Sequence, residues 1–183
     1  MTTGRPLSVV VVCTANRFRS PLAAAVLERE LKGLPIEVTS RGVRDVGAMP
    51  PLPQALDSAS RLGIDVSRHR ARAFRAEELR DADLVIGFEE AHLLAAREAG
   101  TPAANLFGLA ELVTLLERLD RKLGPGNYLS SVRSTLAEAD RLRDPASAEL
   151  EIEDPVKKSS PEAAAIADRI HTLSVRLAGL LTP

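Results

Sequence analysis

The chain has 183 residues, the usual length of one domain with a substantial core, and its 45% hydrophobic and 27% charged residues are ordinary for a soluble globular protein. The formal net charge of -1 excludes an overall basic field that would attract nucleic acid or a membrane surface. Cys13 is the sole cysteine, which excludes an internal disulfide and a multi-thiolate metal site. With only three histidines and no close His-x-His or Cys-x-x-Cys spacing, no metal is expected, and no cofactor is expected either.

Strand and helix patterns alternate from the start of the chain. The β-branched run at 9–12 predicts a strand buried on both faces, and a helical period follows from Pro21 to Lys32. The alternation continues with a strand over 36–39, a helix over 52–62, a strand over 84–86, a helix over 89–99, a strand over 105–107 and a helix over 109–119. Strict alternation predicts right-handed βαβ units and therefore an α/β fold with a parallel sheet.

The second part of the chain is more helical and more charged. A turn is predicted at 124–127, a helix over 130–143 and a loop over 146–154. Ser159 and Glu162 form a capping-box pattern that opens a last helix, and one face of this helix is an apolar stripe expected to face the sheet. No repeat or linker divides the chain, so residues 1–183 are predicted to form a single domain.

The first residues bear on the location of the protein. Residues 1–6 lack the long apolar stretch of a signal peptide, and the apolar run that follows is too short to span a bilayer. We therefore expect a cytoplasmic protein with no membrane or nucleic-acid partner.

The segment from Cys13 to Pro21 lies between the first buried strand and the first helix. Ligands of open parallel sheets bind at the carboxyl ends of the strands, and a loop that leads into a helix N-terminus is suited to bind an anion. The same positive potential favours the thiolate form of a cysteine, and the planar fork of Arg19 can hold two phosphate oxygens. The segment therefore predicts a nucleophilic cysteine in a phosphate-binding loop.

The Cys-x5-Arg-Ser-Pro sequence beginning at Cys13 resembles that of the low-molecular-weight protein-tyrosine phosphatases. Other stretches are similar to this family as well, namely 39–43, 63–72, 82–86 and the Asp-Pro pair at 154–155. The resemblance implies a three-layer sandwich, in which a four-stranded parallel sheet is flanked by helices and the phosphate-binding loop follows the first strand. Residues near 122–150 would then form an additional helical segment before the Asp-Pro loop.

The resemblance also implies roles for single residues. Cys13 would attack phosphorus, Arg19 would bind the transferring phosphoryl group, and Asp154 would be the general acid. The substrate's phosphate would be held by the loop residues Thr14, Ala15, Asn16, Arg17, Phe18 and Ser20. Ser20 would also hydrogen-bond the thiolate, while Ser40 and His69 would support the loop from behind, His69 through Asn16.

Three features depart from the family pattern, and a fourth leaves an alternative open. Ala15 replaces the usual glycine, Phe18 replaces a second cysteine, and the sequence after the Asp-Pro pair lacks the usual tyrosines. A second Asp-Pro pair begins at Asp144, which competes with Asp154 for the role of acid.

The sequence gives weaker evidence of a site role for several arginines and histidines. Six arginines could gather at the mouth of the site or simply be solvated, namely Arg17, Arg41, Arg44, Arg68, Arg70 and Arg72. His92 and His171 are interpreted as surface or packing residues rather than ligands.

The resulting hypothesis is a phosphatase that hydrolyses phosphate monoesters, with protein phosphotyrosine favoured over a small phosphate ester, through a cysteinyl-phosphate intermediate. Two alternatives remain: an arsenate reductase that uses an external thiol, and a non-catalytic phosphate-binding regulator. The sequence leaves the oligomeric state open.

Overall fold

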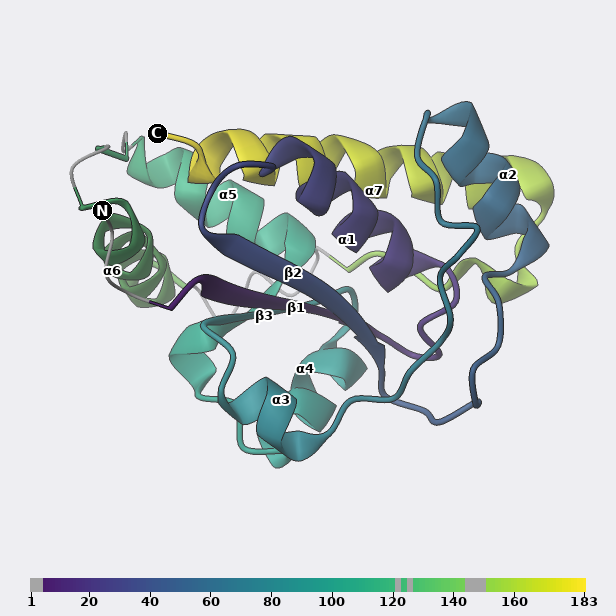
Figure 1. Ribbon diagram of the computed structural model, residues 1–183, viewed down its shortest axis with the longest axis horizontal. Helices are drawn as coiled ribbons and strands as arrows, with labels where there is room; N and C mark the ends of the chain where they lie inside the picture. The colour runs from purple at the N-terminus through teal and green to yellow at the C-terminus, as the bar shows by residue number, and fades with distance from the viewer. Residues whose placement is uncertain (1–4, 121–122, 125–126, 144–150) are drawn as a thin grey trace.

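The computed structural model describes residues 5–120, 123–124, 127–143 and 151–183. Four parallel strands form one sheet in the order β2-β1-β3-β4, with helices on both faces (Figure 1). The strands are β1 (Leu7–Cys13), β2 (Ile36–Gly42), β3 (Leu84–Gly87) and β4 (Leu106–Gly108). The predicted α/β fold with a four-stranded parallel sheet is confirmed.

The central strand β1 separates two hydrophobic cores. Val9 and Val11 belong to the larger core, whereas Val10 and Val12 point to the smaller core on the opposite face. All four valines are at most 3% exposed. The strand is therefore buried on both faces, as its uninterrupted β-branched run predicted.

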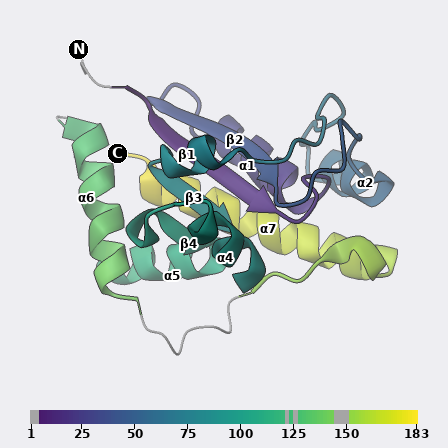
Figure 2. The ribbon, with the colours of Figure 1, turned by 90° about the horizontal axis from the view of Figure 1, so that it is seen from below.

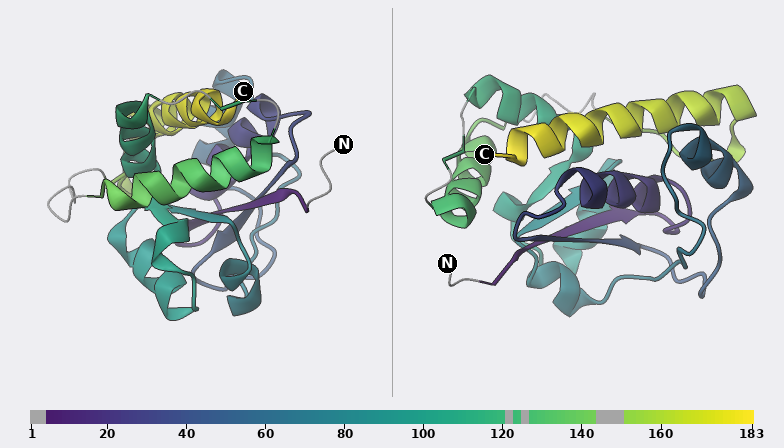
Figure 3. Two further views of the ribbon diagram at one scale, coloured as in Figure 1. Left: turned by 90° about the vertical axis from the view of Figure 1, so that its left-hand side faces the viewer. Right: turned by 45° about the horizontal axis from the view of Figure 1, so that its top comes forward.

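The larger core lies under one layer of helices. This layer contains α1 (Arg19–Glu30), α5 (Leu109–Leu119) and α7 (Ser160–Leu181), with α2 (Pro53–Arg61) beside them (Figures 1 and 3). The opposite face carries α3 (Ala76–Arg80) and α4 (Glu90–Glu98). No helix in the described part of the chain is long and apolar enough to cross a membrane.

Helix α7 begins at the predicted capping box, where the Glu162 carboxylate accepts hydrogen bonds from the amide and hydroxyl of Ser159, at 2.9 and 2.6 Å. Its apolar stripe belongs to the larger core, together with residues of β1 and β3, and the helix also packs against α1, α2 and α5.

Helix α6 (Tyr128–Arg141) lies at the end of the sheet where β1 begins, and it packs against α5 and the short helix η1 (Ala103–Asn105) (Figure 2). The Tyr128 hydroxyl donates a hydrogen bond to the main-chain oxygen of Leu181 at 2.7 Å, which joins α6 to the end of α7. Burial raises the pKa of Tyr128 to about 12. The helix is thus anchored far from the Cys13 end of β1.

The element boundaries differ from the predictions in a few places. Strand β2 continues to Gly42, helix α1 begins at Arg19, and the five-residue helix α3 has no predicted counterpart. Asp144, residues 146–150 of the predicted loop and residues 125–126 of the predicted turn lie outside the described residues.

Candidate active site

The carboxyl end of β1 opens into a pocket of about 390 Å³. Three segments line it: the loop from Cys13 to Arg19, called here the Cys13 loop, the connection after β2, and the segment before α7. The lining residues are Cys13, Thr14, Ala15, Arg17, Phe18, Arg19, Arg44, Leu52, Asp154, Val156 and Lys157. The structure therefore brings the predicted nucleophile, arginine and acid together at one pocket.

Cys13 is 3% exposed, and its sulfur lies 3.0 Å from the Ser20 hydroxyl oxygen. Ser20 is the second residue of α1, so the sulfur faces the N-terminus of that helix. The Ser20 oxygen accepts a hydrogen bond from the Asn16 amide at 2.9 Å, which leaves its own proton to be donated, either to the sulfur or to the Arg41 main-chain oxygen at 3.3 Å. Ser20 can thus hydrogen-bond a thiolate at Cys13.

Asn16 sets the shape of the Cys13 loop. It is fully buried and has a φ of 54°, in the left-handed region that asparagine adopts more readily than most residues. Its side-chain nitrogen donates to Ser20 and to Ser40, each at 2.9 Å, and its side-chain oxygen accepts from the Arg72 amide at 3.0 Å. These bonds hold an uncommon backbone conformation in place.

His69 reaches the Cys13 loop from the connection before α3. Its Nε2 lies 2.8 Å from the main-chain oxygen of Asn16, so the ring nitrogen donates to that carbonyl. Burial lowers the pKa of His69, while its hydrogen bond with Asn16 partly opposes the shift. The two residues predicted to support the loop, Ser40 and His69, therefore both contact Asn16.

Gly42 closes the loop from the β2 side. A Cβ at this position would lie 3.1 Å from the carbonyl carbon of Ala15 and 3.2 Å from both the amide nitrogen of Asn16 and the main-chain oxygen of Arg44. Only a glycine fits here without displacing backbone, so the Cys13 loop and the end of β2 pack in direct contact.

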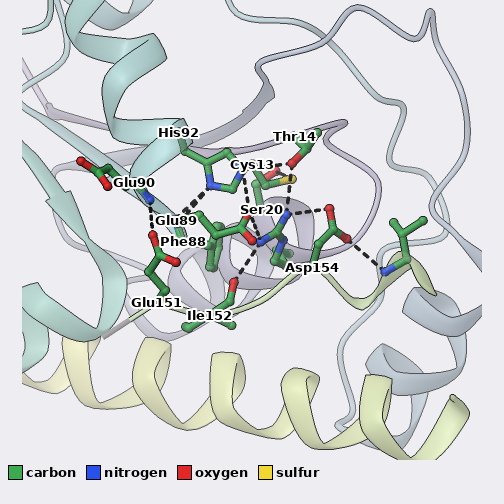
Figure 4. A network of polar contacts seen from close by, with 12 residues as sticks. Cys13, Thr14, Ser20, Phe88, Glu89, Glu90, His92, Glu151, Ile152 and Asp154 are labelled. Atoms are coloured by element: carbon green, nitrogen blue, oxygen red, sulfur yellow. Dashed lines mark hydrogen bonds and ion pairs between the residues drawn. The ribbon is translucent and has the colours of Figure 1, made fainter. Parts of the chain in front are cut away.

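Arg19 is 1% exposed, and its guanidinium is surrounded by acceptors from four residues that Figure 4 labels, namely Thr14, Glu89, Ile152 and Asp154. One terminal nitrogen lies 2.8 Å from Glu89 and donates to the Ile152 main-chain oxygen at 2.9 Å. The other donates to Thr14 at 3.1 Å and to Asp154 at 2.9 Å. Four groups therefore orient the guanidinium.

Asp154 is placed by the short helix η4 (Pro155–Lys157), whose first amide it caps. One carboxylate oxygen accepts from the Val156 amide at 3.0 Å, and the other contacts Arg19. The segment before it is fixed by the Ile152 amide, which donates to the Phe88 main-chain oxygen at 2.8 Å. Asp154 lines the pocket with a side chain that is 36% exposed, whereas its competitor Asp144 lies outside the described residues.

His92 and Glu89 are site residues that the sequence did not reveal. His92 is 2% exposed, and its Nε2 lies 3.1 Å from the Thr14 hydroxyl and 3.4 Å from Glu89, so it is not a surface residue but a buried one that contacts the Cys13 loop. Burial, together with the nearby charge of Arg19, lowers the pKa of His92 to about 4, although Asp154 opposes the shift. No motif marks this histidine, because its contact with Thr14 depends on the neighbouring positions of β1 and β3.

The six arginines separate into two groups. Arg17 and Arg44 line the pocket, where the structure adds Lys157. Arg41 instead forms a two-pronged ion pair with Glu78, at 2.9 and 3.0 Å, which lowers the pKa of Glu78 to about 2. Arg68, Arg70 and Arg72 do not line the pocket. Within the described ranges, no three His, Cys, Asp or Glu side chains form a possible metal-binding group.

Comparison with known proteins identifies the family. Residues 8–123 match the family model for low molecular weight phosphotyrosine protein phosphatases. The chain belongs to this family.

Two curated relatives illustrate the similarity. The low molecular weight protein-tyrosine-phosphatase Etp of Escherichia coli K12 is 35% identical over 86 residues, which cover 47% of this chain and 57% of Etp. The probable low molecular weight protein-tyrosine-phosphatase EpsP of Ralstonia solanacearum is 35% identical over 43% of this chain and 53% of its own length. The chain thus matches little more than half the length of these relatives.

Solved structures resemble a larger part of the chain. A low molecular weight protein tyrosine phosphatase from T. tengcongensis has a TM-score of 0.68 at 25% identity, covering 93% of this chain and 97% of that one. The YwlE arginine phosphatase from Geobacillus stearothermophilus has a TM-score of 0.67 at 25% identity, covering 95% and 92%. The match to the family model ends before α6, so Asp154 lies beyond it.

The contact at Gly42 predicts that Gly42→Ala weakens anion binding, because the new methyl group pushes against three backbone atoms of the site. We expect about tenfold weaker binding of vanadate, since small displacements in a preorganised site are costly. Protection of Cys13 from iodoacetamide by vanadate measures the affinity. Gly179→Ala is the matched control, because a Cβ there has no atom within 4 Å. Unchanged protection in Gly42→Ala would mean that the loop does not depend on this contact.

The buried, neutral His92 predicts a pH-dependent stability. Its folded pKa of about 4 lies below the ordinary histidine pKa of 6.5, so the unfolded chain takes up a proton first as the pH falls. His92 should therefore reduce the free energy of unfolding between about pH 6.5 and 4, by at most about 3 kcal/mol. Urea unfolding of the wild type and of His92→Asn across this range measures the effect. Equal slopes for the two proteins would contradict the prediction.

Proposed function

We propose that this chain is a phosphatase that hydrolyses phosphate monoesters through a cysteinyl-phosphate intermediate. The observation that carries the proposal is the convergence of Cys13, Arg19 and Asp154 on one pocket at a helix N-terminus. Its substrate is a phosphorylated protein, with phosphotyrosine favoured over a small phosphate ester. A cytoplasmic location belongs to the same proposal, as does the organisation of the chain as a single domain.

In the first step, the Cys13 sulfur attacks phosphorus, and the bond between phosphorus and the ester oxygen breaks. Asp154 gives its proton to the departing oxygen, so the alcohol leaves neutral. Arg19 and the loop amides bind the oxygens that carry the charge of the transition state. The protein is then covalently phosphorylated on sulfur.

In the second step, a water molecule attacks phosphorus while Asp154 accepts one of its protons. The bond between sulfur and phosphorus breaks, and inorganic phosphate is released. Ser20, 3.0 Å from the sulfur, donates a hydrogen bond to the departing thiolate. The cycle returns Cys13 and Asp154 to their initial forms.

The contacts of Arg19 indicate that one of its hydrogen-bond partners is replaced when phosphate binds. The nitrogen that now contacts Thr14 and Asp154 faces the pocket residues, while the other is held by Glu89 and Ile152. A phosphate oxygen would replace the Asp154 carboxylate at the first nitrogen. Asp154, no longer paired with Arg19, would take up a proton from solvent and then transfer it to the ester oxygen. The buried charge would stay compensated throughout.

The pocket walls bear on the choice of substrate. The side chains of Leu52 and Val156 are apolar and suit an aromatic ring, although the walls lack the tyrosines usual in the family. Arg44 and Lys157 have no carboxylate partner among the described residues, which disfavours a cationic phosphoarginine side chain. These features support phosphotyrosine rather than the substrate named for the YwlE arginine phosphatase.

The nucleophile has a direct test. Cys13→Ser should abolish turnover of an aryl phosphate yet still bind vanadate, because Arg19 and the amides of the Cys13 loop would bind the oxyanion. Turnover is measured by released phosphate and binding by calorimetry. The same preparation of the wild type is assayed for arsenate reduction with an external thiol. Turnover by Cys13→Ser would end the phosphatase proposal, and arsenate reduction without phosphate release would replace it.

The general acid can be tested by the leaving group. The phenol of tyrosine has a pKa of about 10 and needs a proton to leave, so Asp154→Asn should slow phosphotyrosine hydrolysis by about 10²–10⁴-fold. A nitrophenyl phosphate should be affected much less, because its phenol leaves as the anion. The ratio of the two rates is the measurement.

Two neighbouring carboxylates are the controls for this variant. Glu153 contacts Lys158 outside the pocket, so Glu153→Gln should leave both rates unchanged. Asp144→Asn tests the second Asp-Pro pair. If Asp144→Asn, and not Asp154→Asn, slowed phosphotyrosine hydrolysis more than nitrophenyl phosphate hydrolysis, the general acid would be Asp144.

A further inference from the structure

His92 is the third residue of α4, and Figure 4 shows its ring directed at Thr14 of the Cys13 loop. The ring is nearly inaccessible to solvent, and each of its nitrogens has defined partners. Neither the proposed mechanism nor a sequence motif accounts for a histidine at this position. Its hydrogen bonds show what it does to the residues that bind phosphate.

The partners of His92 decide which ring nitrogen carries the proton. Nδ1 lies 3.3 Å from the amide nitrogen of Phe88 and 3.2 Å from that of Glu89, and both amides are donors. Nδ1 must therefore accept, and the proton resides on Nε2. With its pKa lowered to about 4, the ring is neutral near pH 7 and donates only through Nε2.

The direction of this N–H fixes the role of the Thr14 hydroxyl. The Thr14 oxygen already accepts a hydrogen bond from Arg19 at 3.1 Å, and His92 Nε2 supplies a second one at 3.1 Å. A hydroxyl oxygen has two lone pairs, so both are occupied. The remaining Thr14 proton is free to be donated, and Thr14 lines the pocket next to Cys13.

We propose that His92 is a positioning residue that makes the Thr14 hydroxyl a hydrogen-bond donor to the oxyanion bound in the pocket. The inference rests on the proposed function, and it adds a neutral donor to the charged clamp of Arg19. His92 also lies 3.4 Å from the Glu89 oxygen that contacts Arg19. It thus contacts two of the four groups that orient the guanidinium.

Three variants of His92 separate donation from capping. His92→Asn keeps an acceptor near the position of Nδ1 for the two amides but loses the N–H at Nε2. His92→Gln places an amide N–H near the position of Nε2. His92→Phe removes both functions. We expect kcat/KM for an aryl phosphate to fall about 10–100-fold in His92→Asn and to recover to within about threefold in His92→Gln.

A double-mutant cycle tests whether His92 acts through Thr14. Thr14→Val removes the hydroxyl at nearly constant volume, whereas Thr14→Ser keeps it and should stay active. If the proposal holds, the double variant with His92→Asn and Thr14→Val loses no more activity than Thr14→Val alone. Losses that multiply, or a His92→Gln variant as impaired as His92→Asn, would overturn the proposal.

Binding and stability are measured on the same variants. Vanadate protection of Cys13 from iodoacetamide reports oxyanion binding without turnover, so it tests His92 even if the phosphatase proposal fails. Protection should weaken about tenfold in His92→Asn and stay unchanged in His171→Asn, a control histidine on α7 that contacts Arg29. Urea unfolding shows whether His92→Asn loses activity because it misfolds. If it does, the activity and vanadate protection of His92→Gln decide whether the proposal stands. Full protection in a folded His92→Asn would overturn the proposal.

Discussion

The burial of the Arg19 guanidinium is the interaction on which the rest of the site depends. An uncompensated charge at 1% exposure would cost several kcal/mol, so the fold must bring acceptors to it. Glu89 comes from the N-terminus of α4, Asp154 and the Ile152 carbonyl from the segment before α7, and Thr14 from the Cys13 loop. Three distant parts of the chain therefore assemble around one side chain.

This arrangement couples the phosphate clamp to the general acid. Asp154 is a counter-charge for Arg19, and in the proposed reaction it becomes the proton donor once phosphate takes over that role. The substrate phosphate, whose ester oxygen needs a proton from Asp154, is thus also the group that displaces Asp154 from Arg19. The contact between the Ile152 amide and the Phe88 oxygen keeps the segment in place while the partners of Arg19 change.

The parts of the site that the sequence predicted are local. The β-branched strand, the loop after it and the helix start lie within about two dozen residues, so their order along the chain determines their arrangement in space. The support of the loop by Ser40 and His69 and the position of Asp154 followed from family resemblance rather than from any pattern.

Glu89 and His92 could not be found in the same way, because their positions depend on strand order. Strand β3 pairs with β1 in the register of Val9 with Leu84 and Val11 with Ile86, which places the residues after β3 beside the Cys13 loop. Hydrophobic periodicity identifies a strand but contains no information about its neighbour in the sheet. A histidine after β3 therefore has no sequence signal that distinguishes it from a packing residue. The helix α3 was missed for a different reason, since five residues are too few to show a helical period.

The neutral state of His92 has a consequence for the chemistry of the pocket. A cation at this position would lie beside Arg19, and the repulsion between two buried charges would add to the cost of burying either one. A neutral N–H that acts through the Thr14 hydroxyl supplies a directed hydrogen bond without additional charge. Arg19 itself helps to hold His92 neutral, so the charged clamp and the neutral donor depend on the same buried guanidinium.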